Sequence, residues 1–100
     1  MKRYEVVVSH RAELMLASHI AFLARVSMKA ARRLRDEFAE MLDALETNPF
    51  LFAEAEADHI PEGYRKALFR KRYLAVFYVE KNTVYLDAVL DCRMDHSGMF

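Results

Sequence analysis

The sequence predicts an α+β fold in which a helical hairpin packs on a mostly antiparallel sheet, with the elements in the order βααβββ. Five apolar residues of Ala31–Leu45 recur at intervals of three and four, the spacing of one helix face. Residues of Tyr73–Leu90 instead alternate between the two faces of a sheet. One hundred residues suffice for a single domain with a modest core, so we expect residues 1–100 to form one domain.

The chain begins with a short strand and an apolar helix. Tyr4–Val8 is β-prone, and Ser9 is a suitable N-cap for the helix expected over Arg11–Val26, which contains neither Gly nor Pro. An apolar stripe at helical spacing consists of Leu16, Ile20, Leu23 and Ala24. Met15 and Phe22 widen this stripe, so we expect the helix to be substantially buried.

A second helix follows at once and completes the hairpin. Ser27 caps Met28–Glu46, which carries the regular apolar face, so the two helices are expected to pack antiparallel. Asn48-Pro49 ends this helix because the residue before proline avoids the α region. The connection Phe50–Gly63 then leads to the sheet.

Three strands are predicted between Tyr64 and Leu90. Tyr73–Glu80 is almost wholly apolar, which indicates a middle strand covered on both faces. Lys81-Asn82 separates it from the last strand, Thr83–Leu90, and a two-residue link with Asn is typical of a type I′ hairpin.

The net charge is zero, but the charges are strongly segregated. Residues 1–36 carry a charge of +5, residues 37–62 carry −8, and residues 63–100 carry +3. The chain is therefore not a generally basic nucleic-acid binder, although it can present a local basic face. Cys92 is the only cysteine, and no apolar run approaches a membrane span, so we expect a cytoplasmic protein without a disulfide.

Several segments, in this order, resemble the RelE/ParE superfamily of bacterial type II toxin–antitoxin toxins. They are VSMKAARRL (Val26–Leu34), LDALETNP (Leu42–Pro49), and the block from Tyr64-Arg65 through YLAVFYVEKNTVYLDAVLDCRMD to Asp95. The resemblance implies a curved, mostly antiparallel sheet carrying a helical hairpin. It also implies a cognate protein antitoxin, a hetero-oligomeric toxin–antitoxin complex, and no metal or other cofactor.

The superfamily contains two chemistries. RelE-like members cut mRNA on the ribosome without a metal, whereas ParE-like members inhibit DNA gyrase without catalysis. Arg65 and Arg93 stand where RelE-like toxins have basic residues, and His96 resembles a terminal histidine of some members. Ala67 and Leu74 occupy two further positions that are basic in RelE-like toxins, so half of that set is missing.

RNA cleavage without a metal needs proton transfer and a cation for the developing phosphorane charge. The predicted catalytic residues are Arg93 for that charge, His96 for proton transfer, and Arg65 for phosphate. The predicted target-binding residues are Lys66, Arg70, Lys71 and Arg72. The alternative for Arg93 is an ordinary ion pair with Asp91 or Asp95.

We therefore expect a toxin that cleaves mRNA, with gyrase inhibition as the alternative and a degenerate toxin that only binds antitoxin as a third possibility. Met15, Phe22 and Val26 are the predicted antitoxin-binding residues, because they lie outside the stripe that packs within the chain. His19 lies beside that stripe without a second ligand at helical spacing, and is interpreted as an ordinary helix histidine.

Overall fold

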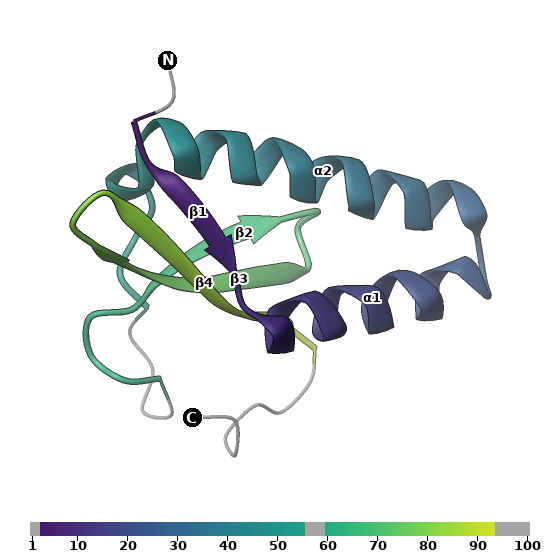
Figure 1. Cartoon of the computed structure of the whole chain (residues 1–100). Helices are drawn as coiled ribbons and strands as arrows, with labels where there is room; N and C mark the ends of the chain where they lie inside the picture. The colour runs from purple at the N-terminus through teal and green to yellow at the C-terminus, as the bar shows by residue number, and fades with distance from the viewer. Residues whose placement is uncertain (1–2, 56–59, 94–100) are drawn as a thin grey trace.

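The computed structural model describes residues 3–55 and 60–93, and its elements follow the predicted βααβββ order (Figure 1). The elements are β1 (Glu5–Val8), α1 (His10–Ala24), α2 (Met28–Thr47), a 3₁₀ turn η1 (Pro49–Leu51), β2 (Arg65–Phe69), β3 (Tyr73–Glu80) and β4 (Thr83–Asp91). Ser9 and Ser27 cap α1 and α2, since their side chains accept hydrogen bonds from the N–H groups of Ala12 and Ala30. The predicted α+β class is confirmed.

The four strands form one mixed sheet in the order β1-β4-β3-β2. β1 runs parallel to β4, whereas β2, β3 and β4 are antiparallel neighbours. The helices form a hairpin, and its tip lies at the same end of the molecule as the β2–β3 turn (Figure 1). Segments far apart in sequence therefore meet at this end.

The core has a layer on each face of the sheet. On the helix face, Leu34 and Phe38 of α2 pack in one cluster with Phe77 and Leu86 of the sheet. On the other face a smaller buried cluster consists of Val76, Ala88 and Leu90, against which Ile60, Tyr64 and Leu74 pack. β3 is thus covered on both faces, as its apolar sequence predicted.

A bulge in β4 makes Asp87 a junction of the fold. The β3–β4 register shifts there, because Val76 pairs with Ala88 whereas Phe77 pairs with Leu86. The Tyr64 hydroxyl donates a 3.0 Å hydrogen bond to the Asp87 carboxylate, and the Ser9 hydroxyl donates a 3.0 Å bond to the Asp87 carbonyl. The bulge therefore ties the start of α1 and the segment before β2 to the sheet.

Two local expectations were wrong. The β3–β4 turn has positive φ at Lys81 but not at Asn82, which is the pattern of a type II′ turn rather than type I′. The Asn82 carbonyl accepts a 3.0 Å hydrogen bond from the Glu5 N–H, so pairing with β1 constrains the turn. α1 is also less buried than expected, since Ala12 is its only fully buried residue.

The exposed side of α1 is apolar. Leu14 and Phe22 are both exposed there, and residues 14–24 include no Asp, Glu, Lys or Arg. A helix that is apolar on nearly all sides is usually covered by something else. Within the described parts of the chain, no helix has the length and apolar character needed to cross a membrane.

Candidate functional site

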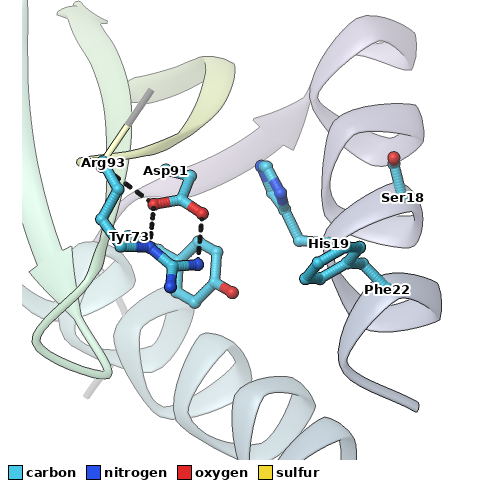
Figure 2. A pocket seen from close by; sticks show the side chains of 6 residues that line it. All are labelled: Ser18, His19, Phe22, Tyr73, Asp91 and Arg93. Atoms are coloured by element: carbon cyan, nitrogen blue, oxygen red, sulfur yellow. Dashed lines mark hydrogen bonds and ion pairs between the residues drawn. The ribbon is translucent and has the colours of Figure 1, made fainter. Parts of the chain in front are cut away.

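A pocket of about 500 Å³ opens between α1 and the end of β4, and we call it the α1–β4 pocket. Its lining residues are Ser18, His19, Phe22, Tyr73, Asp91 and Arg93. Figure 2 shows His19 and Phe22 reaching from α1 toward Tyr73 and Asp91 of the sheet and toward Arg93, which follows β4. Helix spacing explains this pairing of His19 with Phe22, because residues three apart share a face.

Asp91 and Arg93 form a bidentate ion pair at the sheet side of the pocket. The Arg93 side chain donates from Nε to Asp91 Oδ1 at 3.1 Å and from a terminal nitrogen to Oδ2 at 2.8 Å. The Arg93 backbone N–H adds a 3.0 Å bond to Oδ1. These bonds outweigh burial of the carboxyl and hold the pKa of Asp91 at about 2, below its ordinary 3.8.

His19 is fixed against the sheet. Its Nε2 lies 2.9 Å from the Val89 carbonyl, which can only accept, so Nε2 carries a proton. In the neutral ring Nδ1 is then the nitrogen with the free lone pair. The ring also packs 5.1 Å from that of Tyr73, centroid to centroid. The prediction of an ordinary helix histidine fits this bond, but sequence spacing could not place His19 in a pocket with residues of β3 and β4.

The β2–β3 turn concentrates positive charge in a strained conformation. Arg70 and Lys71 both have left-handed φ angles, 54° and 59°. The Arg72 N–H donates to the Phe69 carbonyl at 3.4 Å, as in a type I′ turn. Arg70 pairs with Glu37 of α2 at 3.2 Å, whereas Lys71 and Arg72 have no ion pair within residues 3–55 and 60–93.

This turn faces the tip of the helical hairpin across a second pocket of about 330 Å³. Leu23, Ala30 and Tyr73 line it together with the three basic residues of the turn. Residues 25–35, which surround the hairpin tip, carry five Lys or Arg and no acid. One end of the molecule is therefore strongly basic, and we call it the basic end.

We expect Lys71→Gly to raise the free energy of unfolding by about 1 kcal/mol, because glycine adopts positive φ without a Cβ clash. The control is Lys81→Gly in the β3–β4 turn, where φ is 57° and a similar gain is expected. Urea unfolding measures both. If the chain is a toxin, as its sequence resemblance implies, and the basic turn contacts the target, only Lys71→Gly also lowers toxicity. Equal toxicity of the two variants would contradict a role for Lys71.

The residues predicted to be catalytic do not form one cluster. Arg65 donates a 2.7 Å hydrogen bond to the Phe52 carbonyl and its guanidinium lies 5.0 Å from the centre of the Phe50 ring. Arg65 pairs with Phe77 on one side of β3, and Asp91 pairs with Tyr73 on the other. Four residues of strand separate those levels, about 13 Å. His96 lies outside the described residues, so its role stays a prediction.

The predicted target-binding residues occupy two places. Arg70, Lys71 and Arg72 lie together in the β2–β3 turn. Lys66 is exposed on β2, where it alternates with Arg65 and Ala67 and so points to the opposite face of the sheet. The structure thus brings three of the four basic residues together, and their contact with a target stays a prediction.

The predicted antitoxin-binding residues also divide. Phe22 and Val26 are 60% and 80% exposed. Met15 instead is half-buried and packs against both core clusters, so it is mainly part of the fold. Sequence reasoning missed Leu14, which is exposed on α1; the absence of charges after Glu13 was the signal that could have found it.

Within residues 3–55 and 60–93, no group of three or more His, Cys, Asp or Glu could hold a metal ion. The described residues present an aromatic pocket, an exposed apolar helix face and a basic end. Together with the small α+β fold, these features are suited to contacts with another macromolecule.

The fold is shared with a solved structure described as "Chromosomal ParDE TA system from P. aeruginosa", with a TM-score of 0.71, 13% identity, and coverage of 89% of this chain and 96% of that chain. No curated protein matches the sequence significantly. A family model described as the ParE toxin of the type II toxin–antitoxin system parDE matches residues 6–96. This chain therefore belongs to the ParE toxin family, and its predicted place in the RelE/ParE superfamily is confirmed.

Proposed function

We propose that this ParE-family toxin arrests growth by binding DNA gyrase through its basic end, and that a protein antitoxin covers α1 to prevent this. The observation that carries the proposal is that both arginines predicted to act in RNA cleavage already form hydrogen bonds within the chain. Arg93 is held by Asp91, and Arg65 by the Phe52 carbonyl. A cation already paired within the chain is a poor stabiliser for charge that develops on a phosphate.

The basic end supports a binding mechanism. Lys71 and Arg72 have no ion pair within the described residues, so their charges are available to a partner. Left-handed backbone at two non-glycine residues is costly and is often kept where a site needs that geometry. A binding surface needs only such placed charges and no group that titrates near neutral pH.

RNA cleavage remains the second candidate, because the α1–β4 pocket brings an imidazole, a phenol and a guanidinium together. His19 Nδ1 is a possible proton acceptor there. Tyr73, however, is only 1% exposed, so its hydroxyl is poorly placed to reach a substrate. His96, which the sequence suggested for proton transfer, belongs to this alternative.

Expression of the chain without antitoxin separates the two functions. We expect DNA synthesis to stop before protein synthesis, and the purified protein to inhibit supercoiling by gyrase while mRNA stays intact. Lys71→Gln with Arg72→Gln should weaken this inhibition at least tenfold, since one charged hydrogen bond contributes about 1.5–3 kcal/mol. Lys81→Gln, in the other β-turn, is the control and should change little.

The ribonuclease alternative predicts the opposite result. Early arrest of translation with cleaved mRNA, relieved by His96→Gln or His19→Gln by a factor of about 10²–10⁴, would establish the ribonuclease. If neither process stops and the chain still binds its antitoxin, it is a degenerate toxin that retains only that interaction.

A further inference from the structure

A third pocket lies at the far end of β3 from the basic turn and has the opposite character. It measures about 440 Å³, and its lining residues are Glu62, Gly63, Tyr64, Tyr78, Val79 and Glu80. We call it the Tyr64–Glu80 pocket. β3 begins beside the basic turn at Tyr73 and ends at Glu80, so the length of the strand separates the two sites.

Aromatic rings form one wall of this pocket. Tyr64 and Tyr78 meet edge to face with ring centroids 5.3 Å apart, and Tyr78 stacks on Tyr85 at 5.1 Å. The Tyr64 hydroxyl is anchored by its bond to the Asp87 carboxylate, which fixes the ring. Burial and this carboxylate raise the pKa of Tyr64, so the phenol stays neutral at physiological pH.

Two carboxylates flank the rings. Glu62 and Glu80 are exposed, and neither has an ion pair or hydrogen bond from its side chain within the part of the chain that the structure describes. Glu62 ends a stretch of the sequence, residues 37–62, that carries eight Asp or Glu and no Lys or Arg, whereas Lys81 follows Glu80. The two exposed carboxylates of the lining favour a cation over an anion as the ligand.

Arg65 of this chain shows how an arginine can contact an aromatic ring and a glutamate at the same time. Its guanidinium lies over the Phe50 ring at 5.0 Å, and a terminal nitrogen lies 4.0 Å from the Glu54 carboxylate. An arginine thus uses a ring face and a glutamate together. The residues that line the Tyr64–Glu80 pocket include two tyrosines and two glutamates but no Lys or Arg. Arg11 lies near the Tyr64 hydroxyl, since both contact the Asp87 carboxylate.

We propose that the Tyr64–Glu80 pocket binds an arginine side chain of a basic segment on a partner protein. The planar guanidinium lies against the tyrosine rings, while its N–H groups pair with Glu62 and Glu80. Lysine fits less well, because its ammonium group is more strongly hydrated and cannot stack. This site is independent of the basic end, so it can be engaged whether or not the basic end contacts gyrase.

Binding of short peptides to the full chain tests the proposal by NMR. The probes are acetyl-Gly-Arg-Gly-Arg-Gly-amide and the same peptide with lysine or with citrulline, a neutral isostere of arginine. We expect saturable shifts of the Gly63 and Val79 amides with the arginine peptide, weaker shifts with lysine, and none with citrulline. Glu62→Gln with Glu80→Gln should weaken binding about fivefold or more, since each exposed pair is worth a factor of about two to five.

Two further variants test whether the location of the charges and the Tyr78 ring matter for binding. Glu40→Gln with Asp43→Asn removes the same charge from α2 and should leave the affinity within about twofold. Tyr78→Leu removes a ring and should weaken arginine binding even where the fold, judged by the remaining amide spectrum, is intact. Equal shifts with citrulline, equal losses in the α2 control, or no saturable shift at Gly63 and Val79 would each overturn the proposal.

Discussion

Phe22→Glu is expected to weaken antitoxin binding at least thirtyfold while the toxin itself stays folded and toxic. Phe22 projects from the uncharged face of α1 at the rim of the α1–β4 pocket and is 60% exposed. Aromatic residues beside a pocket are the usual centres of protein interfaces, and losing one costs 2 kcal/mol or more, about thirtyfold. Calorimetry with the purified antitoxin measures the change.

The stability of the isolated toxin should change by less than about 0.5 kcal/mol, because most of the Phe22 side chain is in water. In cells the variant should therefore kill even when antitoxin is co-expressed. Leu51→Glu is the matched control: it places the same charge on an 81% exposed apolar residue of η1, away from α1. If antitoxin neutralises Phe22→Glu as well as it neutralises Leu51→Glu, α1 is not the antitoxin site.

The type and order of the helices and strands could largely be predicted from the sequence, because each element is marked by residues that lie close together in it. Ser9 and Ser27 cap the helices, Asn48-Pro49 ends the second, and the 3–4 spacing of α2 marks its buried face. Each signal depends on neighbours within a few residues. The burial of α1 was overestimated for the same reason: an apolar stripe shows which face avoids water, but not whether this chain or a partner covers it.

The site was much less predictable, because its contacts join residues far apart in sequence. His19 bonds to the Val89 carbonyl, 70 residues away. Asp87, in the bulge of β4, forms hydrogen bonds with Ser9, Arg11 and Tyr64, and the periodicity of the sequence does not predict a bulge. Arg93 was read as catalytic from a family resemblance, with an ion pair to Asp91 or Asp95 as the alternative. The structure shows the pair with Asp91, and whether Arg93 also acts on a target is a separate question.

That question is decided by removing the Asp91–Arg93 pair in steps. Arg93→Ala leaves the Asp91 carboxylate, only 8% exposed, without its bidentate partner. The Arg93 hydrogen bonds are the main cause that lowers the pKa of Asp91 from 3.8 to about 2, which corresponds to about 2 kcal/mol. We expect a loss of that order, a large part of the 5–15 kcal/mol typical of a small domain. Arg35→Ala breaks an exposed pair with Asp36 and should cost under about 0.5 kcal/mol.

The pH dependence of stability identifies the carboxylate responsible. Because the folded pKa of Asp91 is depressed, its contribution is complete above the ordinary value near 3.8 and is lost as the pH falls toward 2. Urea unfolding between pH 5 and 2 should therefore show a smaller decline in Arg93→Ala and in Asp91→Asn than in the unmodified chain. An unchanged decline in both variants would mean that other carboxylates account for the acid sensitivity.

The double variant Asp91→Asn with Arg93→Ala then separates stability from toxicity. A neutral amide is far cheaper to bury than a carboxylate that has lost its bidentate partner, so the double variant should recover at least half of the stability lost in Arg93→Ala. If Arg93 only supports the fold, toxicity recovers with stability. If toxicity stays lost although the unfolding curve recovers, the Arg93 guanidinium contacts the target directly. The loss of this half-exposed side chain then has an effect beyond the loss of its bond to Asp91.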